Sequence, residues 1–173
     1  MAVKTSWAAG DVLLAADLTD TFGAKAPLAS PTFTGNVVWS AATLRVGTAS
    51  VATQQTTTSN VTYTDLATSG PAVTLTTGTK ALVTIGAYLY NQTTGSNNAY
   101  MSFAVSGATT VAAADDRCLM VQFSTAQVVL RGSRTFLITG LTPGSNTFTA
   151  KYSAGAGTAV FADRFISVMD LGS

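Results

Sequence analysis

The sequence predicts an all-β protein, an antiparallel β-sandwich of the jelly-roll type, on three observations. From residue 60 to the C-terminus, short β-prone runs alternate with turn signals at close spacing, as they do in sandwiches. No apolar period of 3.6 residues occurs after Phe22. Thr, Ala, Ser, Gly and Val dominate the composition and favour strands and turns over helices. We therefore expect a C-terminal sandwich domain over residues 60–173.

The strands of this domain follow from β-prone runs that end at Gly, Pro, Asn or Ser. The clearest alternation places Phe148, Ala150 and Tyr152 on one face of a strand. Strands are expected over residues 61–66, 72–76, 81–90, 99–105, 119–123, 127–131, 134–139, 147–152 and 164–171.

The last expected strand, residues 164–171, is apolar on both faces. One face carries Phe165, Met169 and Leu171, and the other carries Ile166 and Val168. A strand with two apolar faces is typical of burial on both sides. We therefore predict that one of its faces is an interface.

Residues 1–24 form the first predicted segment, an N-terminal helical attachment arm. Leu14, Leu18 and Phe22 recur every fourth residue, which places them on one stripe of a short helix. Asp11 is placed to cap its start and Gly23 its end. A helix this short does not persist alone in water, so its stripe must dock, either on another protein or on its own domain.

Residues 25–59 form the second predicted segment, an extended trimerisation and linker region. Pro27 and Pro31 exclude a helix or a central strand over residues 25–35. Leu28 and Phe33 then lack an apolar partner within the segment, and symmetry mates are the simplest way to bury them. Residues 36–59 are expected to be short strands, an extended shaft-like stretch or a polar linker.

Two sequence elements resemble proteins of bacteriophage particles. The string Ala-Pro-Leu-Ala-Ser-Pro-Thr-Phe-Thr-Gly at residues 26–35 is similar to an element of tail-fibre and related virion proteins, often ahead of a trimeric β-structured tip. The pattern W-x-x-G-D-x-L-x-A-A-D-L-x-D-x-F, which starts at Trp7, resembles the opening of fibre and minor structural proteins. The expected strand series is also similar to tumour-necrosis-factor-like and C1q-like trimeric tips, whose final strand lies near the trimer axis.

The resemblance implies a homotrimer, attached to other virion proteins of the tail or capsid. It further implies a place on the virion surface after assembly in the cytoplasm of a bacterial host. Large aromatic side chains often anchor interfaces, so Trp7 and Trp39 are also expected to be attachment residues. The predicted interface and attachment residues are Trp7, Leu14, Leu18, Phe22, Pro27, Leu28, Pro31, Phe33 and Trp39.

Charge and composition exclude several classes of protein. Only 10% of residues are charged and the net charge is +1, with basic residues scattered singly, so nucleic-acid binding is not expected. A surface so poor in charge is hard to keep soluble as a free monomer, which favours a subunit of an assembly. No apolar run is long enough to cross a membrane, and no signal peptide is evident. The single cysteine, Cys118, excludes an internal disulfide.

The residue types needed for most catalysis are missing. The chain has no histidine, and its eight acidic residues are all Asp, so triads and histidine-ligated zinc are excluded. We expect no enzyme activity and no cofactor. Asp115 and Asp116 are the only adjacent acidic pair. They are expected in a solvent-facing loop, with a calcium or magnesium ligand role as the alternative.

The polar loop at residues 91–100 is a candidate contact for a host cell-surface glycan. Sugar recognition commonly combines aromatic rings with amide side chains. The residues in question are Tyr90, Asn91, Asn97, Asn98 and Tyr100, with a plain solvated hairpin loop as the alternative.

Together these features predict a structural bacteriophage virion protein. The first placement is a tail fibre or receptor-binding tip that meets the host. The alternative is a capsid decoration or head fibre protein, held on the shell by its N-terminal arm. A carbohydrate-active enzyme or an unrelated binding module is the remaining class, and the absence of His and Glu argues against the enzyme.

Overall fold

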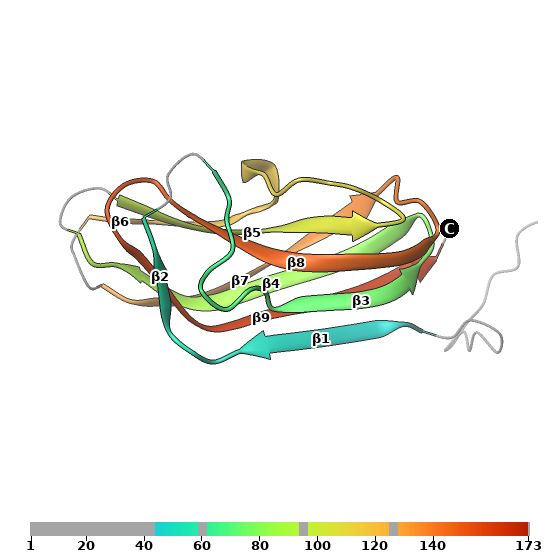
Figure 1. The fold of residues 1–173 in the computed structure, drawn as a ribbon, viewed down its shortest axis with the longest axis horizontal. Helices are drawn as coiled ribbons and strands as arrows, with labels where there is room; N and C mark the ends of the chain where they lie inside the picture. The colour runs from blue at the N-terminus through green and yellow to red at the C-terminus, as the bar shows by residue number, and fades with distance from the viewer. Residues whose placement is uncertain (1–43, 59–61, 94–96, 125–127, 173) are drawn as a thin grey trace, which may run out of the picture. The chain divides into compact units, whose positions relative to one another are not determined.

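The computed structural model describes residues 44–58, 62–93, 97–124 and 128–172. Within these ranges the chain forms nine β-strands and one turn of 3-10 helix, in two antiparallel sheets (Figure 1). The predicted helical arm and proline-containing element lie outside the described residues. None of the helices in the part that the structure describes is long and apolar enough to span a membrane.

Sheet A is the larger sheet, and β9 and β4 form its centre. Its order is β1-β9-β4-β7. β1 pairs with residues 164–169 of β9, and the short strand β2 pairs with residues 159–161 of the same strand. The strands are β1 (Val46–Val51), β2 (Gln55–Thr57), β4 (Lys80–Asn91), β7 (Leu130–Thr139) and β9 (Ala159–Gly172).

Sheet B covers one face of sheet A and has the order β3-β8-β5-β6 (Figure 1). Leaving out β2, the strands in chain order run 1-8-3-6 in sheet A and 2-7-4-5 in sheet B. This is the double Greek key of a jelly roll, so the predicted fold class is confirmed. The strands are β3 (Ala72–Thr77), β5 (Asn97–Gly107), β6 (Leu119–Phe123) and β8 (Gly144–Ala154).

The core lies between the sheets and follows strand alternation. Along β8, Phe148, Ala150 and Tyr152 are fully buried, as their spacing predicts. Phe103 of β5 lies 6.4 Å from Phe148, and Tyr152 lies 4.9 Å from Phe161 of β9 (ring centroids). These aromatic contacts join β5 and β8 within sheet B and link sheet B to sheet A.

The sandwich begins earlier than the predicted residue 60. β1 and β2 lie within residues 36–59, where short strands were one expectation beside a shaft-like stretch or a linker, and both pair with β9. The inward positions of β1 are Gly47, Ala49 and Val51, which are small and give little hydrophobic contrast in the sequence. The expected strand over residues 61–66 is wrong, because in its described part only Thr64 pairs, in a single bridge to Tyr152.

A β-bulge in β9 changes which side chains face the core. Gly86 of β4 pairs with Phe165 and Tyr88 pairs with Ala162, so Asp163 and Arg164 together oppose one β4 residue. Arg164 is turned inward and is fully buried.

Both terminal nitrogens of the buried Arg164 guanidinium donate to neutral oxygens, whereas its Nε has no acceptor among the described residues. The guanidinium donates to Gln55 Oε1 at 2.9 Å and to the carbonyl oxygen of Gly70 at 3.3 Å, and it lies 5.3 Å from the Tyr152 ring centroid. A buried charge needs such partners, so Arg164 fastens β2 and the 66–71 segment to β9.

Candidate functional site

The outer face of sheet A carries a row of apolar side chains that the sandwich itself does not cover. Strand register aligns Val46 of β1, Met169 of β9, Leu82 of β4 and Leu137 of β7 side by side. Val46 and Leu137 are 53% and 58% exposed. The solvated face of an antiparallel sheet normally carries polar side chains, so an apolar row aligned across four strands is unusual there. We call these four residues the apolar row.

The next row on the same face consists of hydroxyl side chains. Thr48, Ser167, Thr84 and Thr135 are aligned by the same register. The hydroxyls of Thr84 and Thr135 lie 2.8 Å apart and share a hydrogen bond. This face therefore offers apolar contact and neutral hydrogen-bonding groups over two successive rows, with no charged residue in either.

The final strand accordingly has two different faces. Ile166 and Val168 are fully buried in the core, whereas Leu171 is 43% exposed and Met169 is half-buried. The prediction that one face of this strand is an interface remains a prediction, and the exposed apolar side chains are where such an interface would form.

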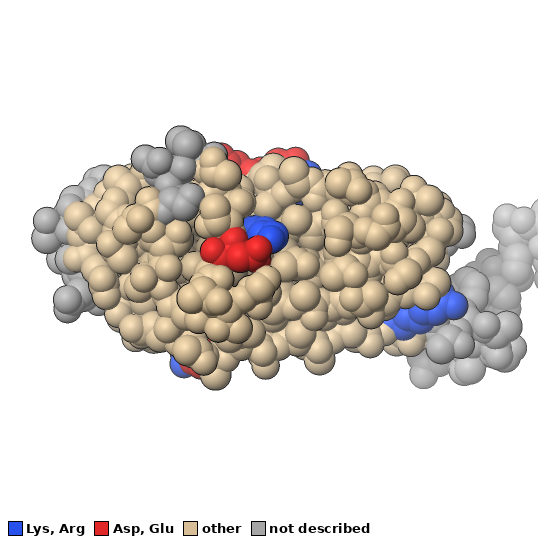
Figure 2. Space-filling model, viewed as in Figure 1, with Lys and Arg blue, Asp and Glu red and all other residues tan. Residues whose placement is uncertain are grey.

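The few charges in the described sandwich mostly occur as pairs. Arg45 pairs with Asp170 at 3.2 Å, and Lys151 with Asp65 at 2.7 Å. In Figure 2 the charged side chains are isolated patches, several of them blue beside red, on a surface that is otherwise tan. Ion pairing inside the chain leaves little net charge to repel a neighbouring copy.

Two of these carboxylates have shifted pKa values. Burial raises the pKa of Asp170, but hydrogen bonds from the backbone N–H groups of Gly78 and Gly172 and from Arg45 outweigh it, and the pKa is lowered. Asp65 also has a lowered pKa, because the hydrogen bonds from Lys151 and Ser69 outweigh the effect of burial.

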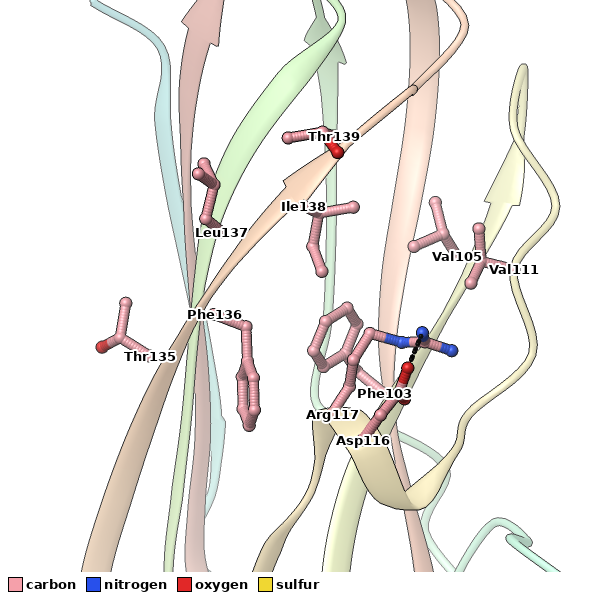
Figure 3. A pocket seen from close by; sticks show the side chains of 10 residues that line it. All are labelled: Phe103, Val105, Val111, Asp116, Arg117, Thr135, Phe136, Leu137, Ile138 and Thr139. Carbon is pink, nitrogen blue, oxygen red and sulfur yellow. Dashed lines mark hydrogen bonds and ion pairs between the residues drawn. The ribbon is translucent and has the colours of Figure 1, made fainter.

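A cavity of about 500 Å³ lies at the outer edge of β7. Figure 3 shows the Phe103 and Phe136 rings and the Ile138 side chain at the cavity, while Thr135 and Leu137 point away from it. Arg117 and Asp116, paired at 3.0 Å, stand at its rim. The cavity is therefore lined by both apolar and polar side chains. The buried Nε of Arg117 has no acceptor among the described residues.

Asp115 and Asp116 lie in the 3-10 turn η1 (Asp115–Arg117). Asp115 accepts a hydrogen bond of 2.7 Å from the hydroxyl of Tyr63, and burial together with this bond raises the pKa of Tyr63. Burial also raises the pKa of the nearby Cys118 thiol. Within the described ranges, no group of three or more His, Cys, Asp or Glu residues could hold a metal ion.

Two asparagines of the predicted glycan loop, Asn91 and Asn97, form hydrogen bonds with backbone groups. Asn91 is fully buried, with its Nδ2 donating to the carbonyl of Ala156 and its Oδ1 accepting from the N–H of Thr93. Asn97 is also buried and donates to the carbonyl of Thr93. These side chains satisfy backbone groups at the loop and are not open to a ligand.

The remaining residues of that set do not form one surface. Tyr90 lies on β4 of sheet A, whereas Asn98 and Tyr100 lie on β5 of sheet B. Asn98 Nδ2 donates to the Tyr100 hydroxyl at 2.7 Å. A shared contact of both tyrosines with one sugar is therefore not supported by their placement.

The predicted attachment residues, from Trp7 to Trp39, all lie outside the described residues. The apolar row was not identified as a set from the sequence. Its members come from four segments between residues 46 and 169, and only register brings them together. The two-faced pattern of the last strand was the one signal, and it indicated Met169.

Comparisons with known proteins bear on the fold. No family model matches the chain, and no curated protein matches it. A chain in the structure of infectious bursal disease virus, Gx strain, aligns at a TM-score of 0.51 and 12% identity, over 73% of this chain and 32% of that one. This chain thus spans about a third of that protein, and the likeness concerns the fold alone.

Two further solved structures align with TM-scores below 0.5. The infectious bursal disease virus VP2 subviral particle aligns at a TM-score of 0.44 and 14% identity, over 73% of this chain and 33% of that one. Dimeric latent PorU from Porphyromonas gingivalis aligns at 0.41 and 16% identity, over 78% and 13%.

Proposed function

We propose that this chain is a non-enzymatic structural protein of a bacteriophage particle, carried on the virion surface as a homotrimer. Three observations support this. The chain shares the jelly-roll fold with a protein in a virus structure. Its surface is poor in charge. Its N-terminal elements resemble those of phage fibre and minor structural proteins.

The apolar row carries the assembly part of the proposal. In the part of the chain that the structure describes, Val46, Leu82, Leu137 and Met169 are aligned on the outer face of sheet A without a covering element. Burial against a second copy removes that apolar area from water, which is the main driving force of stable association. Because β9 lies at the centre of this sheet, the arrangement is consistent with the trimeric tips whose final strand lies near the axis.

The first placement is a tail fibre or receptor-binding tip that meets the host cell, assembled in the host cytoplasm. The alternative is a capsid decoration or head fibre protein. In both placements the N-terminal segment, residues 1–43, would hold the protein on the particle and the sandwich would be displayed.

Immunogold labelling of intact particles with an antibody against the sandwich tests the proposal. Label at the tail tip would support the fibre placement, and label over the head would support decoration. Particles that contain the protein by mass spectrometry but bind label only after disruption would refute a surface position. Particles without the protein would refute the virion role.

A further inference from the structure

A shallow hollow of about 350 Å³ opens next to the β9 bulge. It is lined by Ala87 of β4, by residues 131–133 of β7, and by Asp163 and Phe165 of β9. The volume is at the lower end of the range for small-ligand sites. None of these residues belongs to the apolar row.

Regular alternation continued from the buried Phe161 would turn Asp163 towards the core, but the bulge leaves its carboxylate at the surface. Asp163 has a φ of +47°, which is uncommon for a residue other than glycine. Its side chain is 44% exposed and is paired with the guanidinium of Arg131 on β7. Non-glycine residues in this region of φ are costly and occur often at ligand sites. Donor and acceptor groups thus stand together at one rim of the hollow.

An aromatic ring lies beside this pair because a glycine makes room for it. A Cβ on Gly86 would lie 2.3 Å from Cε1 of Phe165, so the ring rests directly on the Gly86 backbone. The Arg131 guanidinium lies 5.3 Å from the centroid of the Tyr88 ring. Ser133 adds a hydroxyl from β7. The hollow therefore combines an aromatic surface, a carboxylate, a guanidinium and a hydroxyl.

We propose that this hollow binds a neutral, hydroxyl-rich saccharide. A carboxylate accepts from one sugar hydroxyl while a guanidinium donates to its neighbour, which suits a vicinal diol. The face of an aromatic ring attracts the positively polarised C–H groups of a sugar ring. The Arg131–Asp163 pair is neutral overall, so the site favours an uncharged sugar over an anionic one. The inference deepens the receptor-binding placement and rests on it for the source of the sugar.

The test uses the full chain on an immobilised panel of neutral oligosaccharides that end in glucose, galactose, mannose or N-acetylglucosamine, with a sialylated glycan for comparison. The main variant is Asp163→Asn, because asparagine tolerates a positive φ while losing the charge. Asp116→Asn is the matched control. It removes an equally charged, exposed carboxylate that is also paired with an arginine.

We expect the wild type to bind at least one neutral glycan and Asp163→Asn to bind it about tenfold or more weakly, because a hydrogen bond to a charged group is lost. Asp116→Asn should bind as the wild type does. A second variant, Ser133→Ala, should also weaken binding without changing the melting temperature. Binding that Asp163→Asn leaves unchanged, binding of the sialylated glycan alone, or no binding by any panel member would overturn the proposal. Particle labelling is independent of these results, so failure here leaves the virion role standing.

Discussion

Replacing Leu137 by aspartate should break the proposed self-association without unfolding the chain. Leu137 lies on β7, points to the outer face of sheet A and is 58% exposed. Full burial of a leucine side chain contributes about 1.5–3 kcal/mol, so its exposed part is worth about 0.9–1.7 kcal/mol per chain. For three chains the substitution removes about 3–5 kcal/mol of association free energy, which lowers the trimer association constant about 10²–10⁴-fold. An unpaired carboxylate in the interface adds to this loss.

The assay is sedimentation velocity over a range of concentrations. We expect the wild type to sediment as three chains at micromolar concentration and Leu137→Asp to sediment mainly as one. Met120→Asp is the matched control, because Met120 is 49% exposed on β6 of the other sheet and gains the same charge. Circular dichroism checks that both variants are folded.

Two results would refute the reasoning. A wild type that remains a single chain at high concentration would show that the apolar row is not a self-association surface. Equal weakening by Leu137→Asp and Met120→Asp would show that added charge, and not the row, controls association.

Two further predictions concern the stability of sheet A, measured by thermal and urea unfolding. Gly86→Ala should destabilise the fold by about 1–3 kcal/mol, because its Cβ would collide with the Phe165 ring, whereas Gly132→Ala meets ordinary contacts only and should be tolerated. Asp170 has a lowered pKa in the folded state, so its contribution is present above its ordinary value of 3.8 and is lost as the pH falls through the folded-state pKa. Asp170→Asn should therefore lose less stability than the wild type between about pH 4 and pH 2, and an equal acid dependence would contradict this.

Much of the sandwich could be predicted because local pattern and burial agree. β6 was predicted over 119–123 and is observed there, and the alternation of Phe148, Ala150 and Tyr152 marks buried positions of β8. For β1 and β2 the sequence left short strands and a linker as alternatives, because their inward side chains give little hydrophobic contrast, and pairing with β9 makes them strands.

The functional surfaces were harder to predict because they depend on register and on one bulge. Leu82 and Leu137 are adjacent only after β4 pairs with β7, and such non-local pairing leaves no short-range signal. The bulge shifts the alternation of β9 by one residue, so that Phe161 and Arg164, three residues apart, both face the core. A glycan contact was predicted at the 91–100 loop, but the amides of Asn91 and Asn97 bind backbone groups, and the hollow that we propose as a saccharide site lies at Asp163.

The two proposed surfaces lie on one sheet and should act together. Leu137 is four residues along β7 from Ser133, roughly 13 Å, so the apolar row can be buried while the hollow stays open. A trimer then carries three hollows, and engagement of several on a glycan-coated surface can strengthen retention about 10²–10⁴-fold over a single site. Leu137→Asp should bind free oligosaccharide as the wild type does but be retained far less on the coated surface. Equal retention of both proteins would show that assembly contributes nothing to attachment.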